Sequence, residues 1–271
     1  MELLDALILG IIQGLTEFLP VSSSGHLLVG KSFLGYEGKS GLLFEIVVHV
    51  GTLLAVVLVY RESLKQYVTG SLQFVKGDGS FAQKWKQQQS VREIFWICVA
   101  TVPTGLIGIL FKKQFESVGV PIVAVMFFVT AFVLLLTRWL SAGERPAADI
   151  IWWQALLIGL AQGLAITPGI SRSGSTIACA LLLGMRRDDA ARFSFLLSIP
   201  AICGALLLKI LKGEFAGVEV MPLLVGGLSA GIVGYFALRW LIKLVKEGQL
   251  AWFSLYLVIL GGSLLGYHLS G

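Results

Sequence analysis

The sequence predicts an all-α polytopic membrane protein, and three observations support this fold class. Hydrophobic residues make up 56% of the 271 residues and charged residues only 14%, whereas soluble domains average about 45–50% and about 25%. The mean hydropathy is +0.85. Residues 120–137 contain no charged side chain, and this length approaches the roughly 20 residues that a helix needs to cross a bilayer. The hydrocarbon core offers no hydrogen-bond partner to backbone N–H and C=O groups. Helices form these bonds internally, so we expect the spans to be helices.

Eight apolar segments follow one another along the chain, and they fall into two kinds. Six are long enough to be transmembrane helices: residues 43–60, 94–111, 120–137, 193–208, 221–238 and 251–268. The other two, 6–19 and 150–166, run into Pro20 and Pro168, and each is followed by a Ser/Gly-rich turn and a second short apolar stretch. This pattern predicts two re-entrant helical hairpins, which are tolerated where protein or water satisfies their turns. The polar segment 61–93 is expected to be a cytoplasmic loop with at most a surface helix.

An internal repeat supports this division of the segments. Residues 13–15, Gln-Gly-Leu, recur 149 positions later as residues 162–164, and Ser22, Ser24 and Gly25 match Ser171, Ser173 and Gly174. We therefore expect a single integral membrane domain, 1–271, built from a first repeat of about 1–140 and a second of about 150–271. Each repeat holds one hairpin and three spans. Because three is odd, the second repeat is expected to be inverted, an architecture that transporters use with a site at the repeat interface.

The basic residues predict the orientation in the membrane. Of the 21 Lys and Arg residues, fourteen fall on one predicted side, and six fall on the side of the N-terminus: Lys31, Lys39, Lys112, Lys113, Lys209 and Lys212. The positive-inside rule therefore places both termini and the mouth of the first hairpin outside the cytoplasm. The net charge of +5 is explained by this topology and by anionic lipid headgroups rather than by nucleic-acid binding. The remaining basic residue, Arg172, lies inside the second hairpin.

The two predicted hairpin tips carry the chemistry of the sequence. Glu17 and Arg172 are ionisable groups at membrane depth, where such groups are costly and usually functional. A structural salt bridge between two broken helices is one interpretation. The other is a phosphate site, because an Arg fork, hydroxyl groups and a helix N-terminus all favour a bound phosphate. Seven hydroxyl-bearing residues surround the pair, which favours the phosphate: Ser22, Ser23, Ser24, Ser171, Ser173, Ser175 and Thr176.

Gln13 and Glu17 are four residues apart and share one helix face. The Glu17 carboxylate has three possible roles: metal ligand, base, or a partner that orients His26. Mg²⁺ or Ca²⁺ held by one or two carboxylates and substrate phosphates would suit such a site. Beside a serine nucleophile, His26 is a candidate acid/base. Glu45 and His49, also four apart, either assist this site or form a local structural pair, and the spacing leaves both open.

Two motifs carry a family resemblance. "QGLTEFLPVSSSGH", residues 13–26, together with "PGISRSGST", residues 168–176, resembles the undecaprenyl-pyrophosphate phosphatases, also called bacitracin-resistance phosphatases, and the likeness covers essentially the whole chain. The resemblance implies an integral enzyme of the bacterial inner membrane that depends on a divalent metal, Mg²⁺ or Ca²⁺. Such an enzyme hydrolyses the C55 isoprenoid diphosphate to the monophosphate and so recycles the lipid carrier of peptidoglycan synthesis.

Carried over by motif position, the resemblance assigns roles to the residues of both tips. Ser23 is expected to be the nucleophile, with His26 or Glu17 as its base and Glu17 as a possible metal ligand. The expected substrate-binding residues are Gln13, Ser22, Ser171, Arg172, Ser173 and Thr176. The first acidic position is Glu in many relatives and Gln13 here, so Glu17 must carry most of the negative charge.

The main competing prediction is a transporter or lipid flippase, because hairpins entering from opposite sides would suit alternating access. The expected partners are a prenyl diphosphate lipid and membrane lipids, without nucleic acid. A homodimer is also possible, because small residues of the span 221–238 can pack helices either within one chain or between two chains. These residues are Gly226, Gly227, Gly231 and Gly234.

Overall fold

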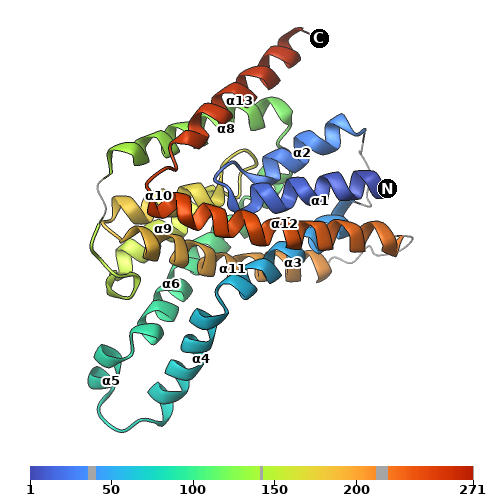
Figure 1. Cartoon of the computed structure of the whole chain (residues 1–271). Coiled ribbons are helices and arrows are strands. Elements are labelled where there is room, and N and C mark those ends of the chain that lie inside the picture. The colour runs from blue at the N-terminus through green and yellow to red at the C-terminus, as the bar shows by residue number, and fades with distance from the viewer. Residues whose placement is uncertain (36–40, 141–142, 212–218, 271) are drawn as a thin grey trace.

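The computed structural model describes residues 1–35, 41–140, 143–211 and 219–270, and the regular structure of these residues is helical (Figure 1). Five helices have the length and hydropathy of a membrane span: α6 Gln89–Leu110, α8 Val120–Leu136, α11 Arg187–Leu211, α12 Val220–Lys246 and α13 Trp252–Ser270. A sixth, α3 Gly41–Val59, continues into α4 Arg61–Lys76 through a bend of 71°. The chain is therefore an all-α, multi-pass membrane protein, as predicted.

The segment 61–93 differs from the predicted loop. It forms α4, then α5 Phe81–Gln87, and then the first turn of α6. Ser80 and Gln83 form a capping box at the start of α5, so side chains satisfy amides that would otherwise lack partners. In Figure 1, α4, α5 and the first part of α6 extend away from the remaining helices. α11 also begins earlier than predicted, where Asp188 and Asp189 lie in its first turn and complement the helix dipole.

Both predicted hairpins are helix–turn–helix units. The first consists of α1 Leu3–Phe18 and α2 Ser23–Phe33, and the second of α9 Trp152–Leu164 and α10 Arg172–Leu182. The second helices begin and end at positions 149 residues apart, which is the offset of the sequence repeat. Ser22 and Ser171 cap these helices by accepting a hydrogen bond from the amide three residues later, at 3.4 and 3.1 Å. The inversion of the second repeat stays a prediction.

Glycines matched by the repeat allow close helix packing in both halves of the chain. α1 packs against α12, and α9 packs against α6. Gly10 and Gly159 stand 149 residues apart, the offset of the repeat. A Cβ atom at Gly10 would lie 2.5 Å from the Gly226 carbonyl oxygen, and one at Gly159 would lie 2.0 Å from the Ala100 carbonyl oxygen. A Cβ atom at Gly14, one turn further along α1, would lie 2.7 Å from the Ala230 carbonyl oxygen. Such distances exclude any side chain without movement of the backbone. The first helix of each hairpin therefore lies against a long helix of the other half, which fixes the hairpins in the bundle.

The glycine series on α12 also packs within the chain. Cβ atoms at Gly226, Gly227 and Gly234 would lie 2.3–2.9 Å from atoms of Phe44, Val47 and Phe18. These glycines seat α12 against α1 and α3 of the same molecule. The intramolecular alternative is therefore observed, and the homodimer stays a prediction.

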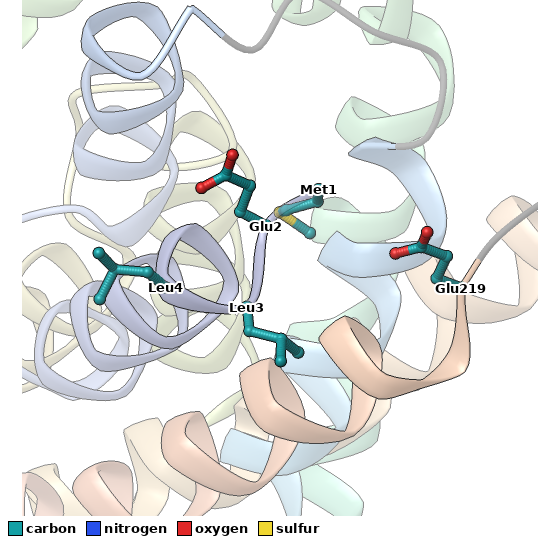
Figure 2. Close-up of a pocket in the computed structure, with 5 residues that line it drawn as sticks. All are labelled: Met1, Glu2, Leu3, Leu4 and Glu219. Atoms are coloured by element: carbon teal, nitrogen blue, oxygen red, sulfur yellow. The ribbon is translucent and has the colours of Figure 1, made fainter.

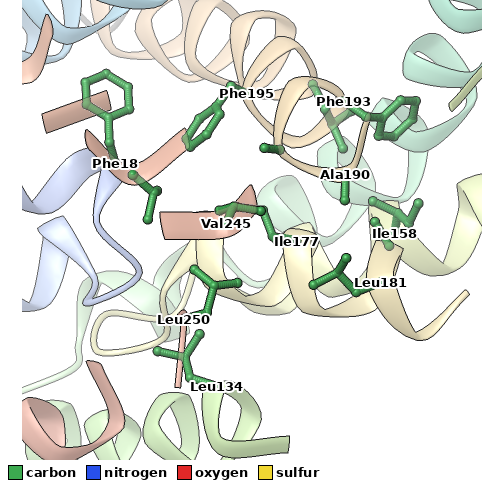
Figure 3. Close-up of a cluster of buried hydrophobic side chains, with 14 of the residues drawn as sticks. Phe18, Leu134, Ile158, Ile177, Leu181, Ala190, Phe193, Phe195, Val245 and Leu250 are labelled. Atoms are coloured by element: carbon green, nitrogen blue, oxygen red, sulfur yellow. The ribbon is translucent and has the colours of Figure 1, made fainter. Parts of the chain in front are cut away.

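A buried apolar cluster lies between the two hairpins and the long helices (Figure 3). Phe18 at the end of α1 meets Phe195 of α11 edge to face, with ring centroids 5.8 Å apart. Ile177 of α10, Leu134 of α8 and Val245 of α12 belong to the same cluster and are no more than 1% exposed. Because interiors of this kind are densely packed, the cluster holds the end of α1 and the start of α10 in a fixed relation.

Replacing Gly14 by alanine is expected to lower the thermal unfolding temperature. The added methyl group must displace the α12 backbone, and overpacking of this kind costs about 1–3 kcal/mol. Thermal denaturation of the purified variant in detergent measures the change. Gly262→Ala is the matched control, because a Cβ there meets nothing within 4 Å. Equal unfolding temperatures for both variants would contradict the packing argument.

Candidate active site

The two hairpin tips meet at an ion pair. Arg172, the first residue of α10, donates from Nη2 to Oε1 of Glu17 near the end of α1. The Glu17 side chain is 5% exposed and the Arg172 side chain 17% exposed. The structure therefore joins the two intramembrane ionisable groups singled out by the sequence, across 155 residues of chain.

The second carboxylate oxygen of Glu17, Oε2, contacts side chains of α1, α2 and α3. Oε2 accepts a hydrogen bond from Ser23 Oγ at 2.6 Å and another from Gln13 Nε2 at 2.9 Å. His49 of α3 approaches the same oxygen, with Nε2 at 3.8 Å. One carboxylate is thus bound by a hydroxyl, an amide and a guanidinium group. The Ser23 hydroxyl thus donates to a carboxylate, an arrangement in which a base can accept the proton of a nucleophile.

An unusual backbone conformation at Ser22, in the turn between α1 and α2, positions Ser23. Ser22 has φ of +72°, in the left-handed region that non-glycine residues seldom adopt. Its hydroxyl accepts a hydrogen bond from the Gly169 amide of the second hairpin at 3.0 Å. Strain of this kind persists only where surrounding contacts hold it, and it clusters at functional sites. The contact with the second hairpin therefore helps to turn the chain sharply enough for Ser23 to face Glu17.

The hydroxyl groups of the second tip mostly support the backbone. Ser173 Oγ donates to the Phe18 carbonyl at 2.9 Å, and Thr176 Oγ1 donates to the Arg172 carbonyl at 2.8 Å and contacts Ser194 Oγ. The Ser171 side chain caps α10. Of the three hydroxyls, that of Ser173 joins the second hairpin to the first, that of Ser171 caps α10, and that of Thr176 bonds within α10 and to α11.

His26 lies in the first turn of α2, and both of its ring nitrogens have hydrogen-bond partners. Its Nδ1 is 2.8 Å from the Ser22 carbonyl oxygen, and its Nε2 is 2.8 Å from the Tyr256 hydroxyl on α13. Because a carbonyl only accepts, Nδ1 carries the proton, and the neutral ring accepts the Tyr256 proton at Nε2. The ring also stacks on Tyr256. The hydrogen bonds of the His26 ring thus go to Ser22 and Tyr256, and its acid/base role stays a prediction.

Glu45 and His49, left open by the sequence, separate into two environments. His49 Nδ1 is 2.7 Å from the carbonyl oxygen of Glu45, and its Nε2 faces Glu17. The Glu45 carboxylate forms an ion pair with Lys31. His49 thus borders the site. A spacing of four residues within α3 indicated only that the two residues share a face, without indicating which neighbours that face meets.

Two buried polar atoms at the tips have no hydrogen-bond partner among the described residues. They are Nη1 of Arg172 and Oε1 of Gln13. Buried polar groups are nearly always paired in native proteins, so both atoms are available to bind a ligand or water. A guanidinium N–H suits a phosphate oxygen, whereas an amide oxygen suits a hard cation or the proton of a water molecule.

The arrangement offers limited support for a metal ion. No group of three or more His, Cys, Asp or Glu residues could hold a metal in the described part of the chain. Glu17 and the free Oε1 of Gln13 provide two oxygen ligands. This set fits Mg²⁺ or Ca²⁺ where substrate phosphates complete the shell, since these cations are commonly bound through one or two carboxylates together with phosphates.

A surface hollow of about 620 Å³ lies at the other end of α1. Met1, Glu2, Leu3, Leu4 and Glu219 line it (Figure 2). Since Glu17 lies at the opposite end of the same helix, this hollow is separate from the hairpin tips.

Comparison with known proteins points to one family. The family model described as "Bacitracin resistance protein BacA" matches residues 6–263. An undecaprenyl-diphosphatase of Desulfatibacillum aliphaticivorans is 42% identical over 272 residues, covering 98% of each chain. Undecaprenyl-diphosphatases of Methanosphaera stadtmanae and Desulforapulum autotrophicum are 40% and 44% identical, each covering 96% of both chains. The match includes both hairpins.

Proposed function

Because the chain belongs to the bacitracin resistance protein BacA family, we propose that it hydrolyses undecaprenyl diphosphate to undecaprenyl phosphate and inorganic phosphate. This reaction recycles the lipid carrier for cell-wall synthesis and would give resistance to bacitracin. The observation that carries the proposal is the hydrogen bond from Ser23 Oγ to Glu17 Oε2, 2.6 Å long, beside a guanidinium group with a free N–H. A flippase moves its lipid without breaking a bond, so it would not need a serine hydroxyl bonded to a carboxylate beside a guanidinium group. Transport is therefore not favoured.

In the first step, Ser23 Oγ attacks the terminal phosphorus of the diphosphate while its proton passes to Glu17. The bond from that phosphorus to the bridging oxygen breaks, and the bridging oxygen leaves with undecaprenyl phosphate. Arg172 binds the transferred phosphoryl group and offsets its charge in the transition state. We choose Ser23 over His26 as nucleophile, and Glu17 over His26 as its base, because His26 Nε2 is hydrogen-bonded to Tyr256.

In the second step, water attacks the phosphoserine. The bond from phosphorus to Ser23 Oγ breaks and Ser23 recovers its proton from Glu17. Inorganic phosphate leaves with the oxygen and the two protons of the water as dihydrogen phosphate, which equilibrates with solvent. Arg172 and the N-terminal amides of α10 are the donors of the second tip that would bind the phosphate in both steps. The other expected binding residues support the site: Gln13 orients the carboxylate, Ser22 and Ser173 join the two hairpins, and Ser171 and Thr176 stabilise the first turn of α10.

The family resemblance implies Mg²⁺ or Ca²⁺, and we propose Glu17 and Gln13 Oε1 as its protein ligands. A bound cation would offset negative charge on the diphosphate. Treatment with EDTA is expected to reduce turnover, and addition of Mg²⁺ or Ca²⁺ is expected to restore it. Full turnover after exhaustive chelation would remove the metal from the proposal and leave Arg172 as the principal counter-charge.

We propose that the site opens to the outer side of the inner membrane, with both termini on that side. Support comes from the excess of Lys and Arg on the opposite side. Two of the six basic residues counted on the side of the N-terminus, Lys39 and Lys212, lie outside the described residues. Membrane lipid surrounds the chain, and its exposed helix faces would accept the prenyl tail.

Phosphate release from purified protein in detergent tests the function. With undecaprenyl diphosphate as substrate, we expect one inorganic phosphate for each undecaprenyl phosphate formed. Detergent micelles separate no compartments, so this assay detects hydrolysis and is blind to transport. Intact substrate after prolonged incubation with folded protein and divalent cation would overturn the proposed function.

A further inference from the structure

The turn of the second hairpin is held by a residue that belongs to neither hairpin. Thr130, in the middle of α8, is 1% exposed. Its Oγ1 donates to the Gly169 carbonyl at 2.9 Å and accepts from the Ser171 amide at 3.0 Å. One hydroxyl therefore satisfies two backbone groups of the turn that lack helical partners, as buried backbone groups require.

Three other threonines of the bundle use their hydroxyls within their own helices, although Thr104, like Thr130, also bonds outside its own helix. Thr16, Thr52 and Thr101 each donate to the carbonyl four residues earlier in their own helix, which is the ordinary arrangement for a helical threonine. Both bonds of Thr130 instead cross to residues 39 and 41 positions away in sequence. The contrast indicates that the hydroxyl at this position serves the turn rather than its own helix.

Contacts on the other side leave the turn little freedom. The Gly169 amide donates to Ser22 Oγ in the first hairpin, so Gly169 is bonded on both sides. Its φ is +97°, and a Cβ there would lie 2.5 Å from Met126 Cβ and 2.6 Å from the Val123 carbonyl oxygen of α8. The turn therefore packs closely against α8. In Figure 1 the yellow turn between α9 and α10 lies beside the blue turn between α1 and α2.

We propose that Thr130 is a positioning residue for hydrolysis, which fixes Arg172 opposite Glu17 and Ser23. The inference rests on the proposed function. The Ser171 amide that Thr130 binds belongs to the residue directly before Arg172, and Ser171 is also the N-cap of α10. Movement of this amide shifts the start of α10 and the guanidinium group with it. Misplacement of a reacting group by about 1 Å can cost about 10² in rate.

Thr130→Val keeps the shape of the side chain and removes both hydrogen bonds. We expect kcat to fall roughly 10- to 100-fold, with KM changed by less than about threefold, because the apolar tail contacts remain. Thr130→Ser restores the hydroxyl and should recover most of the activity. Thr137→Val is the matched control. Thr137 is also buried, and its hydroxyl donates to the carbonyl of Leu134, three residues earlier, so its loss should leave kcat near the wild-type value.

Two further measurements separate positioning from general destabilisation. Hydrogen exchange of the peptide 165–176 should quicken in Thr130→Val and not in Thr130→Ser or Thr137→Val. In an Arg172→Lys background, Thr130→Val should lower kcat far less than in wild type, because residues acting as one unit are non-additive. Wild-type kcat in Thr130→Val, or an undiminished effect in the Arg172→Lys background, would overturn the inference. An inactive wild-type enzyme would instead reject the proposed function.

Discussion

Ser23→Ala is expected to reduce turnover of prenyl diphosphate by at least about 10³-fold, because removing a nucleophile abolishes the covalent route. The hydroxyl is the donor of the 2.6 Å bond to Glu17, so its loss removes the attacking atom and leaves the carboxylate paired with Arg172 and Gln13. The fold should be unaffected, since Ser23 follows the capping residue Ser22 rather than serving as the cap. Initial rates of phosphate release and the thermal unfolding temperature measure the two effects.

Ser24→Ala is the matched control for this substitution. Ser24 occupies the same turn of α2, is exposed, and lies 3.4 Å from Ser22 Oγ rather than at Glu17. Its loss should leave turnover within about threefold of wild type, as surface substitutions usually do little. A substrate labelled in the terminal phosphate should label wild-type protein transiently and Ser23→Ala not at all. Near-normal turnover in Ser23→Ala together with loss in His26→Ala would transfer the nucleophile to His26.

The lengths of the apolar runs predicted the spans, and the prolines with their Ser/Gly-rich turns predicted both helical hairpins, because these features are local in the sequence. The charged and hydroxyl residues of both tips were predicted for the same reason, since an ionisable group at membrane depth is rare enough to stand out. The partners of those residues were not predictable. Tyr256 lies 230 residues from His26, and Thr130 is one threonine in an apolar span, a residue type that usually bonds to its own helix. Only the packing of the helices reveals which of these side chains face the tips.

Glu17→Gln is expected to lower kcat by about 10²–10⁴-fold, the usual contribution of a general base. The amide keeps the size of the side chain and can still accept from Arg172 at its oxygen, but it cannot take the Ser23 proton. The double substitution Gln13→Glu, Glu17→Gln moves the carboxylate one helical turn away. It should remain inactive, because the Ser23 hydroxyl donates to the side chain at position 17, whereas Gln13 contacts Glu17 through Nε2. Recovery in this double variant would mean that only the net charge of the site matters.

A second double variant distinguishes catalysis from a purely structural salt bridge. Breaking a buried ion pair from one side costs about 3–5 kcal/mol, whereas replacing both partners by neutral groups of similar volume is often neutral or stabilising. Glu17→Gln alone leaves the Arg172 charge, 17% exposed, without its counter-ion, so its unfolding temperature should fall. Adding Arg172→Met should restore that temperature while turnover stays as low as in the single variant. If turnover returned together with stability, the pair would serve only to join the hairpins, and the site would have to be sought elsewhere. Stability regained without turnover would place the proton transfer and the phosphate charge on these two side chains.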